Sequence, residues 1–450
     1  MKIKDVAALE EILAGERARF VETHPRSEAM FERSRASLLN GVPMNWMTKW
    51  ATPFPLFAQD AEGCHVTDVD GHRYLDLCLG DTAAFFGHNP VPLTDALSQR
   101  AARGLAMMMP TEDAIHVGVA LQRHFALKYW QIAMTATDAN RFAIRLARAI
   151  TGRHKVLVFN GGYHGSLVET LVELAGDAVE PNADSLGPEC DPATTTRVVE
   201  YNDLEALEHA LAHGDVACVL AEPALTNCGL VPPEEGFHDG LRELTRRYGS
   251  LLLIDETHTI CTAPGGFTRA FGLEPDILTV GKSIGGGVPV AVFGFSEDTA
   301  ARIDGVMESA GSGVYAVGGT LAGNALSLRA LRVTLETLMT EDAFDRMIGV
   351  AERMELDVAA SIARHRSPWY VRRLGACVAY GFRPTAPRNG GEALAQSDPL
   401  LESVLHLFFI NRRVLLTPFQ TMALVSPQTT LEDAARHARV FDLFAATVAA

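Results

Sequence analysis

One lysine interrupts the stretch TVGKSIGGGVPVAVFG, residues 279–294, between an apolar run and a cluster of three glycines. The residues around Lys282 have the pattern of a buried strand and a tight loop, where an ammonium group is unfavourable unless it is paired or used chemically. Asp255 ends another apolar run, LLLIDETHT, 27 residues earlier. That separation is about the length of one crossover and the next strand, so both side chains can lie at the same edge of a sheet.

These two residue types suggest one kind of chemistry. A lysine amine in a dry site can form a Schiff base with an aldehyde. A buried carboxylate beside it can keep a pyridinium nitrogen protonated, which is what a pyridoxal phosphate electron sink requires. Equally, an acid at the end of a strand can cap the next helix, and Asp255 taken alone fits that interpretation as well.

The elements that must position these residues follow from short apolar runs that alternate with helical stretches after about residue 112. Strand patterns at KVLVFN, VACVLAEP, LLLIDE, DILTVGK and VPVAVFG alternate with helical patterns such as LEALEHALAHG and FHDGLRELTRRYG. This alternation predicts an α/β protein whose mostly parallel sheet is covered by helices on both faces. Residues 61–80 predict two short strands joined at Asp70-Gly71. After about residue 325 we expect a long helix and a smaller α+β domain, in which residues 385–399 are the most loop-like.

Composition and charge narrow the class of protein. Of 450 residues, 48% are hydrophobic and 21% are charged, as in a globular protein with a sizeable core. The formal net charge of −16 and the lack of a long Lys/Arg run argue against nucleic-acid binding. Seven cysteines form no CxxC pair and no zinc-type spacing, so neither a disulfide framework nor a structural metal is predicted. The charged N-terminus and the lack of a long apolar run lead us to expect a cytoplasmic protein without a membrane segment.

Five motifs together point to one family. IDE, VGKSIGGGVPVAVFG, GGYHGS, AEPALTNCGLVPP and GGTLAGN occur in the order and spacing of class III, fold-type I pyridoxal-phosphate aminotransferases. The chain resembles most the branch of glutamate-1-semialdehyde aminomutases and β-amino-acid transaminases. The resemblance covers roughly residues 50–335 and continues more loosely to the end. It implies a pyridoxal 5′-phosphate cofactor.

The resemblance also implies a domain organisation. A large cofactor-binding domain at residues 76–335 would contain a mostly parallel, seven-stranded sheet flanked by helices. Residues 1–75 would form a helix and a small hairpin, and they would join residues 336–450 in a smaller α+β domain.

Three catalytic residues are implied by the resemblance: Lys282, Asp255 and Tyr163. Lys282 would form the Schiff base with the cofactor and later move a proton between the substrate Cα and the cofactor C4′. Asp255 would pair with the pyridine nitrogen. Tyr163 would stack on one face of the ring, although taken alone it has the pattern of a core aromatic at a strand end.

A phosphate loop is expected where the family has Ser-Gly-Thr-Glu-Ala. This chain has Thr135-Ala136-Thr137-Asp138-Ala139, and hydroxyl and backbone N–H groups at a helix N-terminus can hold a phosphate without a nearby cation. The same residues could form a simple N-cap. Ala136 in place of glycine leaves the backbone less freedom to approach the phosphate.

Three further positions follow only from the resemblance. Glu222 and Asn227 would line the cofactor, with Asn227 near the ring hydroxyl. Thr320 would reach the phosphate of the neighbouring subunit, which implies a homodimer with shared sites. Outside the resemblance, a threonine after Gly-Gly usually marks only a turn.

Thr257 stands where the family usually has a valine that closes the second face of the ring. Its shape suits that role, but its hydroxyl needs a hydrogen-bond partner. His258 could provide one, or it could cap the following loop. We leave His258 and His164 out of the catalytic set, because an isolated histidine is more often structural than catalytic.

Arginine is missing from three places where relatives that handle amino acids bind the substrate carboxylate. These places are the segment MNWMTKWATPFPL, the position of Thr262 and the position of Thr417. Four side chains could instead shape an apolar pocket with a few polar groups: Trp46, Lys49, Trp50 and Gln420. Lys49 could meet a carboxylate as a point charge. Equally, the aromatic residues could pack the N-terminal segment on the core.

The sequence therefore predicts a transaminase that moves an amino group from an amine or amino acid to a keto acid, ketone or aldehyde by a ping-pong mechanism through Lys282. An aminomutase of the glutamate-1-semialdehyde type would use the same residues and keep the intermediate bound, and loop closure separates the two outcomes. A nucleotide-binding oxidoreductase would depend on the glycines at 285–287, but that run lacks the GxGxxG spacing and follows the lysine strand. The joint presence of Lys282, Asp255 and Tyr163 disfavours a non-catalytic scaffold.

Overall fold

The computed structural model describes residues 3–188, 190–310, 316–418 and 420–450, and it divides into two compact units. The first unit comprises Met1–Pro90, Asp342–Ala386 and Gln396–Ala450, and the second comprises Val91–Glu341 and Pro387–Ala395. The sequence suggested boundaries after residues 75 and 335. Residues beyond 75 still bond within the first unit: the Leu77 N–H donates to the Leu415 carbonyl, and the His88 N–H donates to the Gly63 carbonyl.

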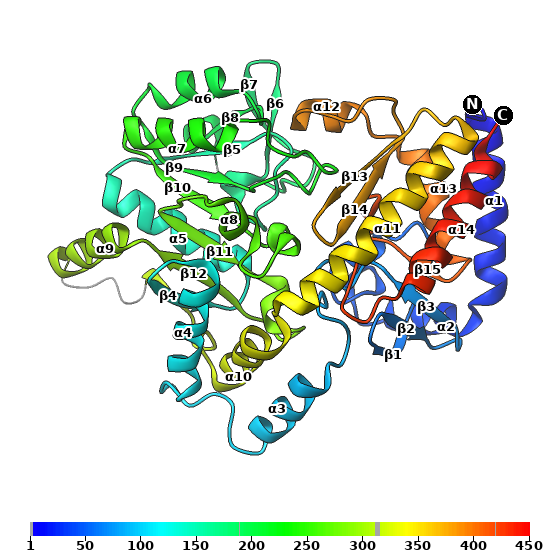
Figure 1. Ribbon diagram of the computed structural model, residues 1–450, viewed down its shortest axis with the longest axis horizontal. Coiled ribbons are helices and arrows are strands. Elements are labelled where there is room, and N and C mark those ends of the chain that lie inside the picture. Colours follow the sequence, from blue (N-terminus) through cyan, green and yellow to red (C-terminus); the bar gives the residue numbers. More distant parts are fainter. Residues whose placement is uncertain (1–2, 189, 311–315, 419) are drawn as a thin grey trace. The chain divides into compact units, whose positions relative to one another are not determined.

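A seven-stranded sheet lies at the centre of the second unit, with the order β4-β12-β11-β10-β9-β5-β8 (Figure 1). All neighbouring strands are parallel except along β12, which runs antiparallel to β11 and to β4. This confirms the predicted mostly parallel sheet. The strands are β4 (Tyr129–Ala133), β5 (Lys155–Phe159), β8 (Thr196–Val199), β9 (Val216–Ala221), β10 (Leu251–Asp255), β11 (Ile277–Val280) and β12 (Ala291–Phe295).

Helices cover both faces of this sheet because alternate strand residues point to opposite sides. In β5, Val156 and Val158 are buried in one core with helices α5 and α9, whereas Leu157 and Phe159 are buried in a second core with α6 and α7. These helices are α5 (Ala136–Thr151), α6 (Leu204–Leu211), α7 (Phe237–Tyr248) and α9 (Glu297–Ala310). The unit also contains α3 (Val91–Ala101), α4 (Asp113–Phe125), α8 (Gly266–Phe271), α10 (Ala325–Val333) and the hairpin β6 (Val172–Ala175) and β7 (Ala178–Pro181).

The segment 385–399, which the sequence suggested as a loop, contains a short helix, α12 (Gly390–Ala395), that belongs to the second unit. Its first residue approaches the backbone of Asn160 so closely that a Cβ on Gly390 would lie 1.8 Å from the Asn160 carbonyl oxygen. The Gly391 N–H donates to Glu200 at 3.1 Å. The glycines that indicated a loop are therefore required for close packing.

Over its described residues, the first unit contains two small sheets and five longer helices. One sheet has the order β1-β2-β3-β15, and its β2–β3 hairpin turns at Asp70-Gly71 as predicted; the other has the order β13-β14-β16. The strands are β1 (Ala58–Glu62), β2 (His65–Asp68), β3 (Arg73–Asp76), β13 (Tyr370–Leu374), β14 (Cys377–Gly381), β15 (Val414–Leu415) and β16 (Met422–Leu424). The helices are α1 (Val6–Thr23), α2 (Pro25–Ser34), α11 (Glu341–His365), α13 (Pro399–Ile410) and α14 (Leu431–Val448).

The two ends of the chain lie side by side in the first unit (Figure 1), where the Lys4 N–H donates to the Val448 carbonyl at 3.0 Å. Among the described residues, no helix has both the length and the apolar character needed to cross a membrane.

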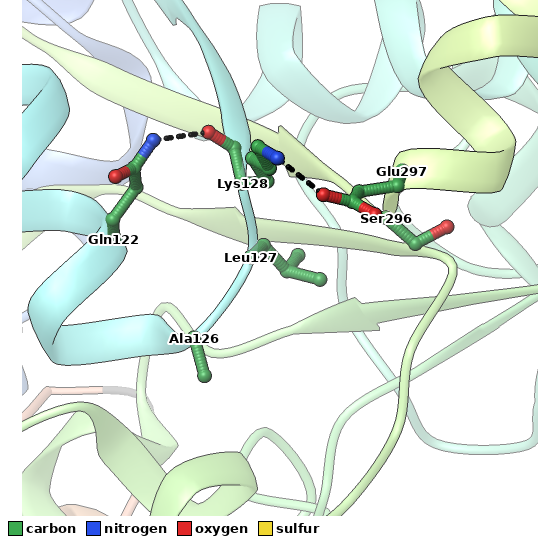
Figure 2. Close-up of a pocket in the computed structure, with 6 residues that line it drawn as sticks. All are labelled: Gln122, Ala126, Leu127, Lys128, Ser296 and Glu297. Carbon is green, nitrogen blue, oxygen red and sulfur yellow. Dashed lines mark hydrogen bonds and ion pairs between the residues drawn. The ribbon is translucent and has the colours of Figure 1, made fainter.

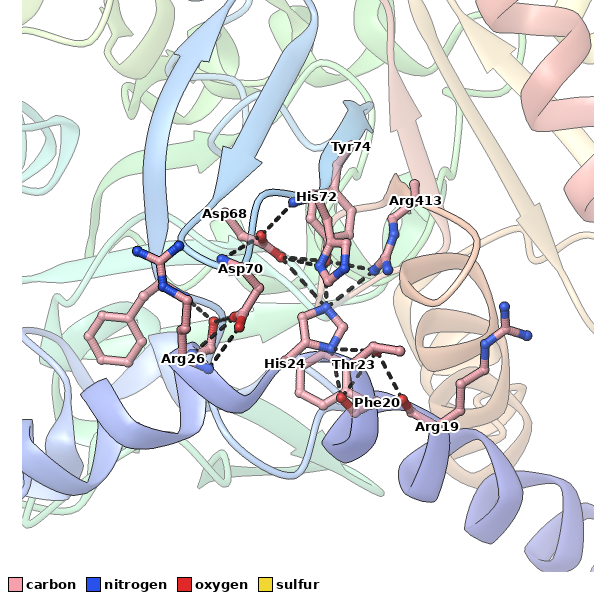
Figure 3. A network of polar contacts seen from close by, with 12 residues as sticks. Arg19, Phe20, Thr23, His24, Arg26, Asp68, Asp70, His72, Tyr74 and Arg413 are labelled. Carbon is pink, nitrogen blue, oxygen red and sulfur yellow. Dashed lines mark hydrogen bonds and ion pairs between the residues drawn. The ribbon is translucent and has the colours of Figure 1, made fainter.

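A buried polar network ties α1 to the β2–β3 hairpin within this unit (Figure 3). His24 is fully buried, with Nδ1 2.7 Å from the Phe20 carbonyl and Nε2 2.8 Å from the Tyr74 hydroxyl. Tyr74 donates to Asp68 at 2.8 Å, and the Arg413 guanidinium lies 3.2 Å from His24 Nε2. Burial, and then the charge of Arg413, lower the pKa of His24, although its hydrogen bond to the Phe20 carbonyl raises it. The network is therefore built around a neutral imidazole.

Candidate active site

The carboxyl ends of β10 and β11 bring Asp255 and Lys282 to one edge of the large sheet. Asp255 is the last residue of β10 and pairs in register with Thr279 of β11, and Lys282 begins the turn just after β11. Lys282 has φ of 47°, in the left-handed region that residues other than glycine rarely adopt. Such conformations cost about 1–3 kcal/mol and cluster at functional sites. The predicted proximity of these residues along the sheet edge is thus confirmed by the strand register.

Asp255 is almost completely buried, with 4% of its surface exposed, and it is surrounded by hydrogen-bond donors. His164 Nδ1 lies 3.1 Å from one carboxylate oxygen, and the backbone N–H of Thr257 donates to the other at 3.1 Å. Burial by itself would raise the pKa of Asp255. The hydrogen bond and electrostatic attraction of His164, with help from Asn140, outweigh burial and lower the pKa to about 2. Asp255 is therefore an ionised carboxylate in a dry site.

Asn140, on helix α5, holds this carboxylate in place through a hydrogen bond. Its side-chain NH₂ donates to Asp255 at 2.8 Å and to the His164 carbonyl at 3.1 Å, while the Thr279 hydroxyl donates to its carbonyl oxygen at 2.7 Å. The sequence predicted no role for Asn140, and we left His164 out of the catalytic set. A signal for Asn140 existed, because it lies on the same buried stripe of α5 as Ala143 and Ile144.

The Lys282 amine lies 2.6 Å from Nε2 of His258, a residue that is 8% exposed. The two alternatives that the sequence offered for His258 did not include this contact. The Thr257 hydroxyl has no well-aligned hydrogen-bond partner among the described residues, and neither has the buried hydroxyl of Ser283. His258 is therefore directed at the lysine, and two buried hydroxyls beside Asp255 and Lys282 are left to meet another molecule.

The N-terminus of α5 lies against the backbone that precedes Lys282. A Cβ on Gly281 would lie 2.8 Å from the Cβ of Ala136, so a methyl group fits on only one of these two residues. Thr135 caps the helix by accepting from the Asp138 N–H at 3.1 Å, and the Thr137 hydroxyl accepts from the Ser166 N–H at 3.2 Å. The first backbone N–H groups of a 16-residue helix thus lie beside the lysine turn, where an anion would be favoured.

Glu222 organises the loop that follows β9 and is only 3% exposed. One of its oxygens accepts from the Tyr163 N–H at 3.3 Å and from Asn227 at 3.0 Å, and the other accepts from the Thr226 N–H at 3.1 Å. Burial raises the pKa of Glu222. Tyr163 leaves 42% of its surface exposed, which suits a ring-stacking role. The expected contacts of Tyr163, Glu222 and Asn227 with a cofactor remain predictions.

The other residues singled out from the sequence differ in their exposure. Thr320 is exposed on the second unit. The candidate pocket residues belong to the first unit, where Trp46 and Lys49 are exposed, Trp50 and Gln420 are partly exposed, and Thr417 is buried. Their assignment to a substrate pocket stays a prediction.

A surface hollow in the second unit lies at the opposite edge of the large sheet, where β4 begins and β12 ends (Figure 2). It is lined by Gln122, Ala126, Leu127, Lys128, Ser296 and Glu297. Lys128 and Glu297 form an ion pair, and Gln122 donates to the Lys128 carbonyl at 2.6 Å. Thr135 follows the last residues of β4, and Lys282 follows the last residues of β11, which is separated from β4 by β12. Because the hollow lies at the start of β4, it is not part of the candidate active site.

Comparisons with known proteins agree with this geometry. The family model described as Aminotransferase class-III matches residues 46–410. A glutamate-1-semialdehyde 2,1-aminomutase from Halobacterium salinarum is 36% identical over 352 residues, which cover 77% of each chain. A glutamate-1-semialdehyde-aminomutase from Pseudomonas aeruginosa has a solved structure with a TM-score of 0.96 and 49% identity, covering 99% of both chains. A β-phenylalanine aminotransferase from Variovorax paradoxus has a TM-score of 0.85 and 26% identity, covering 97% of both chains.

The cofactor of this chain is pyridoxal 5′-phosphate, and a second structure of the Pseudomonas protein is a complex with PMP. The residues present fit such a group. The Lys282 amine can bond to its aldehyde, the ionised Asp255 can hold a positive ring nitrogen, and the N-terminus of α5 suits its phosphate. The unpartnered hydroxyls of Thr257 and Ser283 are further polar groups that a bound cofactor would satisfy.

Proposed function

Because this chain belongs to the class III aminotransferase family, we propose that it isomerises a small amino aldehyde, changing which of two adjacent carbons carries the amino group. The observation that carries the proposal is its nearly full-length similarity to the Pseudomonas glutamate-1-semialdehyde-aminomutase. The sequence alone favoured transfer between two substrates. The names of the relatives support the alternative, aminomutase activity, more strongly.

The residues at the sheet edge would divide the chemistry among them. Pyridoxal phosphate, when bound, supplies an electron sink that makes the proton beside the substrate nitrogen acidic. Lys282 would hold the cofactor covalently, and its amine would remove and return that proton. Asp255 stabilises the positive charge on the ring nitrogen. His164 and Asn140 keep Asp255 ionised and oriented. Tyr163 would cover one face of the ring and Thr257 the other.

Glutamate-1-semialdehyde, the substrate named in the relatives, is the first compound to test. We expect the purified protein to convert it, with no second substrate, into the isomer that carries the amino group on the terminal carbon and a ketone on the neighbouring carbon. Mass spectrometry and NMR identify this product, whose mass equals that of the substrate. Conversion that depends on an added amino donor or keto acid would contradict the isomerase assignment.

Lys282→Ala is the matched control for spontaneous rearrangement of the substrate. This variant is expected to lose about 10³-fold in rate or more, because it lacks both the covalent anchor and the proton carrier. Borohydride treatment followed by peptide mass spectrometry should locate pyridoxal phosphate on Lys282 in the unmodified protein. Attachment to another lysine would refute the site itself.

Transamination between two substrates is the second candidate function. Arginine is missing from three expected carboxylate-binding places, which argues for a substrate less dependent on a bidentate carboxylate contact. The similarity to a β-phenylalanine aminotransferase points the same way. The test is β-phenylalanine as donor with a keto acid as acceptor. Formation of the new amino acid, with glutamate-1-semialdehyde left unchanged, would favour this function.

A homodimer with shared sites also belongs to the proposal. The second unit exposes several apolar side chains within a short segment: Met108 at 84%, Met109 at 70%, Ile115 at 70% and Val119 at 63%. Ile115 and Val119 are four residues apart on α4 and so lie on one face of that helix. A partner chain that covers this segment would remove an unfavourable apolar surface from water.

A further inference from the structure

His258 lies at the start of a turn that is held rigidly at the end of β10. The turn Thr259–Thr262 is anchored by Glu256, which accepts hydrogen bonds from the Thr259 hydroxyl and from the backbone N–H groups of Phe267 and Thr268. The Cys261 N–H closes the turn on the His258 carbonyl at 3.3 Å. Because this backbone is fixed, the imidazole is held against the Lys282 amine, with 2.6 Å between Nε2 and Nζ.

Two basic groups at this distance cannot both carry a proton without strong repulsion. One nitrogen must donate and the other must accept, so the contact requires that at least one of them is neutral. The contact therefore accommodates a single proton shared between the amine and the imidazole.

The buried carboxylates at this edge of the sheet have partners of their own. Asp255 is bound by His164 and Asn140. Glu222 is bound by Thr226 and Asn227, and burial raises its pKa. Glu256 faces its own turn, and burial raises its pKa also. The imidazole of His258 lies at 2.6 Å from the Lys282 amine, within reach of its proton.

We propose that His258 is a positioning residue for Lys282, which holds the amine in place and exchanges one proton with it. In the exchange an N–H bond at Lys282 Nζ breaks, an N–H bond at His258 Nε2 forms, and the positive charge passes from the ammonium to the imidazole. The amine is left with a free lone pair, ready to attack an aldehyde or to accept a proton from substrate. The proposal rests on the proposed function, because it assigns His258 a part in the work of Lys282.

The pH dependence of Lys282 acetylation tests this exchange without cofactor or substrate. Acetic anhydride reacts only with the free amine, and peptide mass spectrometry measures the rate at each lysine of the full-length protein. An isolated amine loses its reactive form about tenfold per pH unit. As long as the pair holds one proton, the fraction of molecules in which His258 carries it does not depend on pH. The fraction with a reactive Lys282 amine therefore levels off.

We therefore expect the Lys282 rate to change less than about threefold between pH 6.5 and 5.5, whereas His258→Leu restores a fall of about tenfold. His258→Gln keeps a hydrogen-bond acceptor but cannot carry the proton, and it should resemble His258→Leu. Lys128, an exposed lysine at the opposite edge of the sheet, serves as the internal reference in every sample. Identical profiles at Lys282 in all three proteins would overturn the proposal.

His124→Leu is the matched control, because His124 is also 8% exposed in the second unit but bonds to the Leu335 carbonyl at 2.8 Å instead of to a lysine. This variant should keep the levelled profile at Lys282. If it loses that profile too, the effect comes from disturbed packing and the proposal fails. Failure of the proposed function gives a different result, since pyridoxal phosphate would then not be trapped on Lys282 of the unmodified protein at any pH.

Discussion

Asp255 keeps its negative charge in the site although burial opposes ionisation. The carboxylate is 4% exposed, yet its pKa falls to about 2 because His164 and Asn140 direct donors at it. A depressed pKa means that the ionised form stabilises the fold above the ordinary value near 3.8, and that this stabilisation is lost only as the pH falls through about 2. Asp255 is consequently charged throughout the range in which enzymes work.

The role of His164 gives the first prediction. His164→Leu removes the hydrogen bond and the charge that offset the effect of burial on Asp255. The pKa of Asp255 should therefore rise, and the carboxylate should become protonated in mildly acidic solution. We expect the acidic limb of the kcat/KM profile to move upward in pH, with the loss of rate growing as the pH falls from 7.5 toward 5. The measurement is the rate between pH 5 and 9. An acidic limb that stays in place, as it should in His124→Leu, would contradict this role.

Helix α5 packs against the turn that contains Lys282, and this contact leads to the second prediction. Gly281→Ala would place a methyl group 2.8 Å from the Ala136 Cβ and push the helix N-terminus away from its position. We expect binding of pyridoxal phosphate to weaken about tenfold, because the phosphate loses aligned N–H donors. Equilibrium dialysis measures the affinity.

The double variant Ala136→Gly with Gly281→Ala tests the same contact from the other side. It removes the clash by exchanging which residue carries the methyl group, so most of the affinity should return. If the double variant binds as weakly as Gly281→Ala alone, the clash is not the cause of the loss.

The apolar patterns of the strands determined how much of this site could be predicted from the sequence. Apolar runs that end in Asp255 and precede Lys282 located the strands and their shared edge, since parallel strands present their carboxyl ends together. The contact of His258 was not readable, because it depends on the turn after β10 and not on any repeat. The helix α12 was not predicted because its glycines are typical of a loop. The close approach of Gly390 to Asn160 becomes evident only in the folded structure.

Neutral buried histidines affect the stability of the whole molecule. Burial lowers the pKa of His24, His124 and His238, and it lowers the pKa of His406 and His437 to about 4. Each unfolded histidine binds a proton near pH 6.5, so the unfolded chain takes up more protons than the folded chain below that pH. Their contribution to stability is complete above about pH 6.5 and is lost progressively as the pH falls toward 4.

The free energy of unfolding should therefore drop between pH 7 and pH 5 by several kcal/mol, at about 1.4 kcal/mol for each proton taken up per pH unit. Urea unfolding at the two pH values measures the drop. His437→Phe should make it smaller, since the unfolded chain then has one imidazole fewer to protonate. An unchanged drop in His437→Phe would show that other groups control the acid sensitivity.

Shared sites in a dimer would make the molecule's activity depend on two chains at once, and Thr320 permits a direct test. Thr320→Val should weaken the phosphate site of the partner chain, and Lys282→Ala should disable the chain's own site. Each variant alone is expected to be poorly active. A mixed dimer contains one site with an intact lysine in the Thr320→Val chain, and that site receives an intact Thr320 from the Lys282→Ala chain.

Mixing the two inactive variants, with unfolding and refolding to exchange subunits, should therefore restore up to about a quarter of the normal activity, since half of random dimers are mixed and each has one good site. Refolding each variant alone is the control. If Thr320 instead serves the site of its own chain, the mixed dimer has no complete site and mixing restores nothing. Restored activity would thus place Thr320 across the interface and show that the protein works as a dimer.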